Sequence, residues 1–473
     1  MTFHTLHCGA CKSPGVVLTA LIMTGCHSGG GSSPVVVGLT DSLGGTLTGL
    51  VGSGLVLQDP VQLNGPGANG SNVLFGSATI NTSYDLSVET QPTNPSQTCV
   101  VANGTGTASG TIFAPANVTN IVVTCTTNPP RFVFVANRGS NNVSAYTVDA
   151  ATGTLAATPG SPFAAGNLPV AIAVDPRGNY AYVANQTDAT ISAFTIDHTS
   201  GALAAVKGSP FATGPAPNSV AIDPSSSFVY VTNGDAGTVS AYAIAADGAL
   251  SAVSGSPFAT GSSPSSVAVN PHEYPAVALT TYVYVANQAD DTVSQFTINF
   301  SNGALTGALS ADGAQVAAGM GPRALAVDPS GQFVYVANAT VNSLSGYNFS
   351  NNNLGVPAVL GGSPYQTGSG PNSVAVDPLD NFVYVANQDS DTISAYGLAA
   401  SGDLTALAGA PFATGDAPSA VAVDPTGNFV YVTNAGSGSV SVFAINAGTG
   451  ALSEIGGSPY ATASLPSAIA ISD

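Results

Sequence analysis

Few side chains in this sequence could carry out acid–base or nucleophilic chemistry. Lys and Arg together number six, and there are five His and five Cys in 473 residues. Arg323 and Arg138 could hold a carboxylate or a phosphate group through paired N–H donors. His272 and Glu273 are adjacent in a loop insertion and could supply a general base. These four are the candidate catalytic residues, although two solvated surface arginines and a tolerated loop insertion are the simpler explanation.

No established cofactor pattern accompanies these residues. The sequence has no Ser-His-Asp spacing, no Gly-rich phosphate loop and no Cys/His cluster with metal-ligand spacing. Two acidic loops, Asp290-Asp291 and Asp389-Ser390-Asp391, do not match the spacing of an EF-hand. We therefore expect no cofactor, with calcium as the alternative.

The first 26 residues have the pattern of a removable leader. Lys12 is followed by an apolar stretch from Val16 to Met23, which is too short to span a bilayer. The stretch ends at Cys26 in a pattern that resembles a bacterial lipoprotein signal, so lipid on Cys26 is expected. No Asp follows Cys26, which implies the outer membrane or cell surface. A plain secretory leader, giving a periplasmic or secreted protein, and a mis-assigned start are the alternatives.

A flexible linker (27–34) precedes a first folded module over residues 35–127. Its short alternating apolar and polar runs predict a small β-sandwich. The module resembles the Ig-like modules of bacterial lipoproteins, which implies a spacer or an adhesive stalk. Cys99 and Cys125 are its two cysteines, and we expect a disulfide between them in an oxidising compartment. A proline linker (128–130) then ends the module.

The overall charge limits the choice of partners. Asp and Glu number 25, which gives a net charge of −19, while only 7% of residues are charged. Binding to nucleic acid needs clustered cations, so it is excluded as a function. Contact with a membrane is expected only through the lipid on Cys26. Partners would be a protein, a glycan or a small lactone, and the protein is expected to be a monomer.

A strand ending in Asn recurs seven times in residues 131–473. The spacings between successive asparagines are 48, 48, 54, 51, 49 and 47 residues. A Ser follows each Asn by seven residues, and an aromatic residue lies two residues beyond the Ser. The asparagines are Asn137, Asn185, Asn233, Asn287, Asn338, Asn387 and Asn434. Repeats of this length with four short strands each predict the blades of a seven-bladed β-propeller.

The ends of this region predict how the ring closes. The first repeat starts at Phe132 without an inner strand, and residues 466–472 form an inner strand with no blade after them. These residues should complete the first blade and remove its exposed edge. The expected fold is therefore all-β, with a seven-bladed propeller after the small sandwich.

Propeller geometry predicts a channel mouth at the starts of the inner strands. One residue after the entering proline of each blade should face this mouth. These residues are Val170, Asn218, Ser265, Arg323, Asn372, Ser419 and Ser467. The mouth is polar and has one cation. The repeated asparagines and the repeated Asp-Pro turns are explained first as turn formers, although the turn aspartates could also form an acidic collar for a cation.

The Tyr-Val-Ala/Thr-Asn strands, Val-Asp-Pro turns and Gly-Ser-Pro-Phe-Ala-Thr-Gly linkers resemble bacterial YVTN-type propellers of the lactonase family. The resemblance covers residues 131–473. It implies hydrolysis of a sugar lactone, as in 6-phosphogluconolactonase-like members, with His, Arg and Glu around the channel. Because this chain has few such side chains, the first functional hypothesis is a surface-anchored scaffold that binds a protein or a glycan without catalysis. A lactone hydrolase is the alternative.

Overall fold

The computed structural model describes the chain in two compact units, Met1–Asn128 and Pro129–Asp473. The residues described are 40–48, 50, 55–57, 61–63, 70–79, 83–90, 97–103, 105–107, 118–127, 131–271, 281–301, 304–349 and 357–472. The predicted leader with Cys26, the linker 27–34 and the pair His272–Glu273 lie outside them. Over the described residues, no helix has the length and apolar character needed to cross a membrane.

The first unit is built from short strands in three sheets, as far as its residues are described. Its strands are β1 (Thr40–Thr48), β2 (Leu55–Leu57), β3 (Val61–Leu63), β4 (Gly70–Thr79), β5 (Ser83–Asp85), β6 (Val88–Thr90), β7 (Gln97–Ala102), β8 (Thr105–Thr107) and β9 (Val118–Thr127). The sheet orders are β4-β1-β9-β7, β3-β2-β6 and β5-β8. Leu47, Leu57 and Ile121 are buried in its core. The all-β prediction is confirmed for this unit, and its Ig-like character stays a prediction.

The backbone of β7 and β9 places the two cysteines of this unit opposite each other. The strands are antiparallel, and Cys99 pairs with Cys125 in their register. Directly opposed residues of antiparallel strands have Cα atoms about 4.5–5.5 Å apart, a separation that a disulfide can span. The disulfide between Cys99 and Cys125 stays a prediction.

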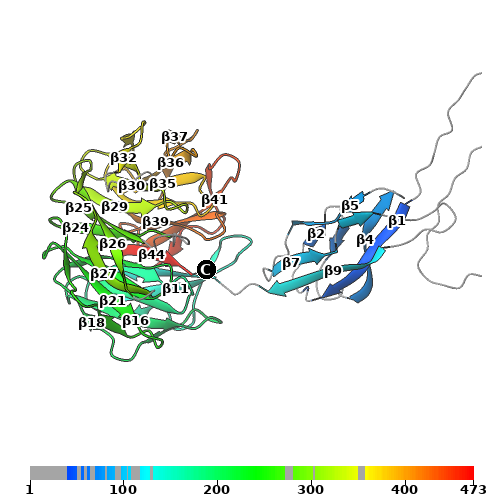
Figure 1. The fold of residues 1–473 in the computed structure, drawn as a ribbon, viewed down its shortest axis with the longest axis horizontal. Coiled ribbons are helices and arrows are strands. Elements are labelled where there is room, and N and C mark those ends of the chain that lie inside the picture. Colours follow the sequence, from blue (N-terminus) through cyan, green and yellow to red (C-terminus); the bar gives the residue numbers. More distant parts are fainter. Residues whose placement is uncertain are drawn as a thin grey trace, which may run out of the picture. The chain divides into compact units, whose positions relative to one another are not determined.

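The second unit consists of seven antiparallel sheets within its described residues (Figure 1). Each sheet is one blade, and its strands run outward from an inner strand. The inner strands are β14 (Pro169–Val174), β19 (Pro217–Ile222), β24 (Pro264–Val269), β29 (Pro322–Val327), β34 (Pro371–Val376), β39 (Pro418–Val423) and β44 (Pro466–Ile471). The second strands are β10 (Arg131–Asn137), β15 (Tyr180–Asn185), β20 (Phe228–Asn233), β25 (Tyr282–Asn287), β30 (Phe333–Asn338), β35 (Phe382–Asn387) and β40 (Phe429–Asn434).

The outer half of each blade has a long third strand and a fourth strand in two short pieces. The third strands are β11 (Asn142–Val148), β16 (Thr190–Ile196), β21 (Thr238–Ile244), β26 (Thr292–Ser301), β31 (Ser343–Asn348), β36 (Thr392–Leu398) and β41 (Ser439–Ile445). The first pieces are β12 (Leu155–Ala157), β17 (Leu203–Ala205), β22 (Leu250–Ala252), β27 (Ala304–Ala311), β32 (Ala358–Val359), β37 (Leu404–Ala406) and β42 (Leu452–Glu454). The second pieces are β13 (Phe163–Ala164), β18 (Phe211–Ala212), β23 (Phe258–Ala259), β28 (Val316–Ala317), β33 (Tyr365–Gln366), β38 (Phe412–Ala413) and β43 (Tyr460–Ala461).

Neighbouring blades cover both faces of each second strand. Every residue of β35 is buried, because side chains on its two faces pack against different blades. The hydroxyl of Tyr182 crosses to the next blade and donates to the carbonyl of Gly248 at 3.0 Å. Between the first and second blades, an aromatic ring packs against a glycine turn in a similar way. Gly201 has φ +73°, and a Cβ added to it would lie 2.3 Å from the ring of Phe132. The blades are therefore fitted to one another by aromatic rings and small turns.

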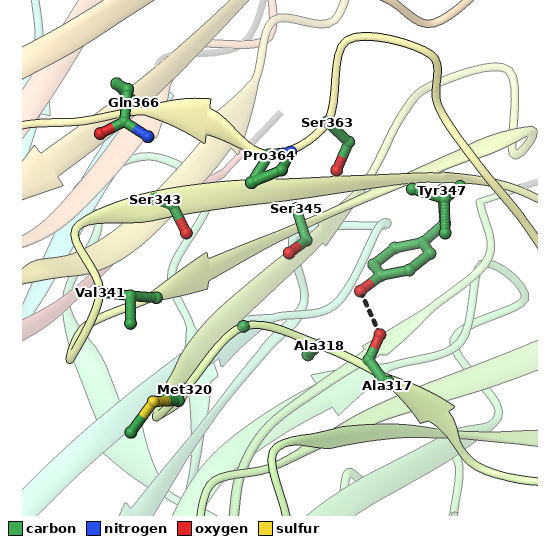
Figure 2. Close-up of a pocket in the computed structure, with 12 residues that line it drawn as sticks. Ala317, Ala318, Met320, Val341, Ser343, Ser345, Tyr347, Ser363, Pro364 and Gln366 are labelled. Carbon is green, nitrogen blue, oxygen red and sulfur yellow. Dashed lines mark hydrogen bonds between the residues drawn. The ribbon is translucent and has the colours of Figure 1, made fainter.

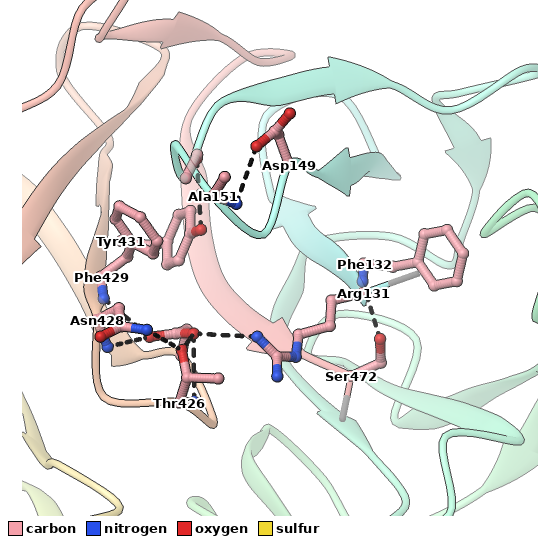
Figure 3. A network of polar contacts seen from close by, with 11 residues as sticks. Arg131, Phe132, Asp149, Ala151, Thr426, Asn428, Phe429, Tyr431 and Ser472 are labelled. Atoms are coloured by element: carbon pink, nitrogen blue, oxygen red, sulfur yellow. Dashed lines mark hydrogen bonds and ion pairs between the residues drawn. The ribbon is translucent and has the colours of Figure 1, made fainter. Parts of the chain in front are cut away.

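The last strand completes the first blade. β44 pairs antiparallel with β10, with Val133 opposite Ile471 and Ala136 opposite Ala468. In Figure 1 the red end of the chain lies against the blue-green start of the same unit, which carries β11. The backbone N–H of Phe132 also donates to the hydroxyl of Ser472 at 2.9 Å (Figure 3). This is the closing pairing that the sequence predicts, and the all-β propeller is confirmed.

Candidate functional site

The strand register divides the propeller into two faces. Pro169 at the start of β14 pairs with Asn185 at the end of β15, so the loops beside them share one face. We call it the mouth face. The turn that begins at Asp175 lies at the other end of the same hairpin. We call this second face the turn face.

Six of the seven predicted channel-mouth residues form hydrogen bonds from one blade to the next, and the ring that they make is interrupted at the apolar Val170. The hydroxyl of Ser467 donates to the carbonyl of Pro169 in the next blade at 2.8 Å. Ser265 and Ser419 make the same bond, to Pro322 and Pro466, at 2.7 Å each. Asn218 donates its amide N–H to the carbonyl of Pro264 at 3.2 Å, and Asn372 donates to Ser419 at 3.2 Å. The structure brings these residues together, and much of their hydrogen bonding joins blades.

Arg323 is the cation of this ring. Its side chain is exposed, and Nη1 donates to Oδ1 of Asn372 at 3.3 Å and to Oε1 of Gln388 at 3.1 Å. Two amide oxygens from the next blade thus hold one nitrogen of the guanidinium group. The remaining N–H donors of Arg323 form no other hydrogen bond with the described residues, so they are available to an anionic or carbonyl oxygen.

A second set of side chains reaches the mouth from the loops that follow the repeated asparagines. Gln388 and Gln186 each come directly after one of those asparagines, and Nε2 of Gln186 donates to Oδ1 of Asn218 at 2.6 Å. Arg138 occupies the equivalent position in the first blade and is exposed. Its guanidinium group makes no hydrogen bond with the described residues. A third glutamine, Gln288, follows Asn287 and is exposed. These glutamines were not among the predicted site residues, although their position relative to the repeat marks them.

Arg138 and Arg323 come from the first and fifth blades, so the structure puts them on the same face but not in contact. A carboxylate also belongs to this face: the exposed side chain of Asp389 lies beside Gly370, where an added Cβ would be 2.4 Å from Oδ2. Among the described residues the single ion pair joins Arg131 to Asp424 at 3.4 Å (Figure 3). Asp389 is therefore not neutralised by either mouth arginine.

The repeated asparagines are structural. Each is buried, and its amide nitrogen donates to the Ser seven residues later on the third strand, for example Asn287 to Ser294 at 2.9 Å. Asn185 and Asn434 make the same bond to Ser192 and Ser441, at 2.9 and 3.0 Å. The fixed spacing of Asn and Ser in the sequence therefore reflects a hydrogen bond between two strands, consistent with the structural role expected for these asparagines.

The turn face buries its repeated carboxylates. Oδ1 of Asp223 accepts the backbone N–H groups of Phe228 and Ser227 at 2.6 and 2.7 Å. Asp424 accepts those of Phe429 and Asn428 at 2.8 and 2.7 Å. These groups are turn formers, as their repetition indicates. Within the described residues, no three His, Cys, Asp or Glu side chains gather so as to hold a metal ion.

Asp380 is an exception on the turn face. Partial burial, followed by the neighbouring carboxylates of Asp328 and Asp377, raises its pKa to about 6. Its Oδ1 atom is buried without a hydrogen-bond partner. Where the second, third, fifth and seventh blades have Gly or Ser at this turn position, the sixth blade has a carboxylate whose charged form is disfavoured.

The acidic loops of the mouth face hold the backbone of the linkers between blades. Oδ2 of Asp290 accepts the N–H of Ser262 at 2.6 Å, and Oδ1 of Asp391 accepts that of Ala417 at 2.7 Å. In the second blade the backbone N–H of Asn167, followed by its side-chain amide, keeps the pKa of Asp188 below its usual value. These loops are built around backbone donors.

His198 is the histidine within the described residues, and it belongs to the turn face. Its Nε2 atom lies 3.0 Å from Oδ1 of Asn179, in the turn that begins at Asp175. The other candidate base, His272–Glu273, lies outside the described residues, so its position relative to Arg323 stays a prediction. The described part of the mouth thus offers arginine, amide and carboxylate groups.

A family described as lactonase, 7-bladed beta-propeller, matches this chain over residues 125–216 and 208–466. No match is found among curated proteins. The fold is also similar to solved structures. A periplasmic gluconolactonase of Pseudomonas aeruginosa is 18% identical, with a TM-score of 0.58, over 73% of this chain and 99% of that protein.

Two further structures have the same fold. A protein from Bacteroides fragilis, provisionally named 6-phosphogluconolactonase, is 18% identical over 74% of this chain and 99% of its own, with a TM-score of 0.61. A Lactobacillus plantarum protein is 24% identical over 73% of this chain and 100% of its own, with a TM-score of 0.58. At these identities the likeness concerns the fold.

Proposed function

The chain belongs to the lactonase family of seven-bladed β-propellers, and from that premise we propose that its mouth face binds a sugar lactone and opens the ring by adding water. The observation that carries this proposal is Arg323, an exposed cation held at the channel mouth by Asn372 and Gln388. The names of two neighbours in fold, a gluconolactonase and a provisional 6-phosphogluconolactonase, support the choice of substrate class.

The reaction needs a group that stabilises negative charge on the carbonyl oxygen. Water adds to the lactone carbonyl carbon, the ring C–O bond breaks, and the ring oxygen leaves with a proton. The free N–H donors of Arg323 would face the developing oxyanion. Asp389 is an exposed carboxylate in the loop that follows Gln388, has no ion pair, and could accept the proton of the water. Arg138 would attract a carboxylate or phosphate elsewhere on the substrate.

The decisive assay measures hydrolysis of glucono-δ-lactone and 6-phosphogluconolactone, corrected for spontaneous ring opening, with calcium and with a chelator. We expect Arg323→Ala to lower kcat/KM by about 100-fold or more. The matched control is Arg177→Ala, which removes an arginine bound to the carbonyl of Ser225 on the turn face. Equal losses in the two variants, or no turnover by the unmodified protein, would reject the hydrolase.

A binding protein without catalysis is the second candidate. It is favoured by the ring residues themselves, whose hydroxyl and amide groups are committed to bonds between blades. In that case the unmodified protein would retain a sugar acid, a glycan or a protein without turnover, and Arg323→Ala would weaken the retention of an anionic ligand.

We also propose that the propeller is attached to the cell envelope by lipid on Cys26. Metabolic labelling with palmitate should mark the native protein and not Cys26→Ser, and the variant should move to the soluble fraction. Equal labelling of both would contradict the anchor.

A further inference from the structure

A hydrogen bond between the entering linker and the loop after the repeated asparagine is missing from two of the seven blades, the third and the fifth, and the fifth departs from the repeat in further ways. Five blades tie the linker that enters them to their own loop: a backbone N–H of the linker, two residues before the proline, donates to an Asp or Ser. Examples are Ser262 to Asp290 at 2.6 Å and Ser369 to Ser390 at 3.1 Å. The third blade has Pro215, which lacks an N–H, and Ala236 at these two positions, and the fifth blade has Met320 and Val341. Met320 keeps its backbone N–H, but the side chain of Val341 has no acceptor for it.

The linker that precedes Met320 is also unusual. Ala318 stands where five other blades have Thr. In the fourth blade that Thr, Thr260, donates its hydroxyl to Asn287 and Ser294 at 3.0 Å each. Ala318 cannot make the equivalent bond to Ser345. Gln366, on β33, is another departure, since the other blades have Ala at its position.

Ala318, Met320, Val341 and Gln366 line a pocket of about 500 Å³ between the outer strands of the fourth and fifth blades. Met320 and Val341 line it although they are 53% and 41% exposed. Figure 2 shows the hydroxyls of Ser343, Ser345 and Ser363 pointing into the same space. This region therefore lacks hydrogen bonds that other blades make, exposes two apolar side chains, and has three hydroxyl groups that point into the pocket.

The serines have hydrogen-bonding capacity left. Ser343 accepts from the amide of Asn338 at 3.2 Å, and Ser363 accepts from the backbone N–H of Gly346 at 3.0 Å. A hydroxyl that accepts can still donate its own proton. Tyr347 closes the inner end by donating to the carbonyl of Ala317 at 2.7 Å (Figure 2). The pocket therefore presents O–H donors and the Gln366 carboxamide beside apolar surface.

We propose that this pocket binds an uncharged sugar unit of a glycan, at the outer part of the mouth face and separate from the channel mouth at Arg323. None of the residues lining it is charged, which argues against an anionic or cationic ligand. Its volume suits a small molecule, whereas a protein partner needs about 800 Å² of surface on each side. Hydroxyl and amide groups match sugar hydroxyls, and Met320 and Val341 match the C–H face of a sugar ring.

The repeat itself suggests a variant in which the unusual side chains of the pocket are replaced by those of another blade. Ala318→Thr, Met320→Ser and Val341→Ser together copy Thr367, Ser369 and Ser390, the residues at the same positions around the sixth blade, and keep the net charge. Gln366→Ala copies the other blades. The control is Ala165→Thr with Leu465→Ser, which makes similar changes away from the pocket and removes an apolar side chain that is 42% exposed.

The full chain is titrated by calorimetry and saturation-transfer NMR with uncharged tetrasaccharides of glucose, mannose, galactose and N-acetylglucosamine. We expect one of these to bind, the triple variant to bind it at least about tenfold more weakly, and Gln366→Ala to bind it about threefold more weakly. The control and Arg323→Ala should bind it as the unmodified protein does.

Three results would overturn the proposal. The first is binding that survives in the triple variant, and the second is binding lost in Arg323→Ala, which would place the sugar at the mouth. The third is the absence of saturation transfer to every sugar tested. If the triple variant then also abolished self-association of the protein, the pocket would be a contact between two copies of the chain. A protein that does not hydrolyse lactones could still bind the sugar in this pocket, so the failure of the hydrolase proposal can be distinguished from the failure of this one.

Discussion

On the turn face the carboxylates of Asp223 and Asp424 are buried and accept backbone N–H groups, whereas on the mouth face Arg323 and Asp389 project into solvent. Both faces are rich in polar side chains. The difference is that the turn aspartates recur at one position in five blades, while Arg occurs at its position in one blade and the position of Asp389 has Asp in two blades, as Asp235 and Asp389. A polar residue that recurs in most blades serves the blade, and one that departs from the repeat is the better candidate for function.

The largest expected effect tests the turn face. Asp223→Ala leaves the N–H groups of Phe228 and Ser227 without their acceptor, so we expect the free energy of unfolding to fall by about 3 kcal/mol. Denaturant unfolding followed by circular dichroism measures it. The control is Asp235→Ala, an exposed carboxylate on the mouth face, with an expected change below about 0.5 kcal/mol. Similar losses of stability in the two variants would contradict the different roles of the turn face and the mouth face.

A smaller loss of stability is expected when a repeated asparagine is replaced. These asparagines lie near the mouth, but like the turn aspartates they are buried and hydrogen-bonded within the blade. Asn287→Ala removes the acceptor of Thr260 and the donor to Ser294, and should lower the free energy of unfolding by about 2 kcal/mol. Ligand binding at the mouth should be unchanged in the fraction that remains folded. A selective loss of binding without a loss of stability would mean that the asparagines are ligand groups.

The carboxyl group of Asp380 makes the stability of the turn face depend on pH. Because its pKa is raised to about 6 in the folded protein, above the unfolded value near 3.8, the stability linked to its protonated form is fully present below pH 3.8 and is lost as the pH rises through 6. Asp380→Asn should therefore raise Tm at pH 7.5 and have little effect below pH 4. Asn tolerates the positive φ of 62° at this position. Calorimetric scans across this range measure it, and a Tm difference independent of pH would contradict it.

The smallest effect on stability is expected at the mouth itself. Arg323→Ala loses two exposed hydrogen bonds, and we expect the free energy of unfolding to change by less than about 0.5 kcal/mol. The same variant should lose most of its lactone hydrolysis or anion binding. Unfolding measured beside activity on one preparation checks both, and a destabilisation comparable to that of Asp223→Ala would show that Arg323 serves the fold.

The sequence predicts what lies within a blade better than what lies between blades. The ten residues from Asp to Asn fix the hairpin register, and the seven from Asn to Ser correspond to a hydrogen bond across two strands. Both are local relations that repeat, so they are visible in one sequence. The blade count and the closing strand follow from the same repeat.

Contacts between blades could not be predicted in this way. Ser265 donates to the carbonyl of Pro322, 57 residues away, and nothing in the spacing of these two residues marks the bond. Gln186, Gln288 and Gln388 were not predicted because only three of the seven blades have glutamine at this position. The pocket near Met320 depends on several absent groups in two adjacent blades, which become visible only when the blades are placed side by side.

The pairing of β10 with β44 has a consequence for how the protein is made. Phe132 and Ser472 are 340 residues apart, so the ring stays open on the ribosome until nearly the whole propeller has been synthesised. Until then β10 has a bare edge that could recruit a strand from another nascent chain. A premature stop codon shortly before Pro466 would release a product with that edge still bare, and such a product is a substrate for proteases rather than a slightly shorter propeller.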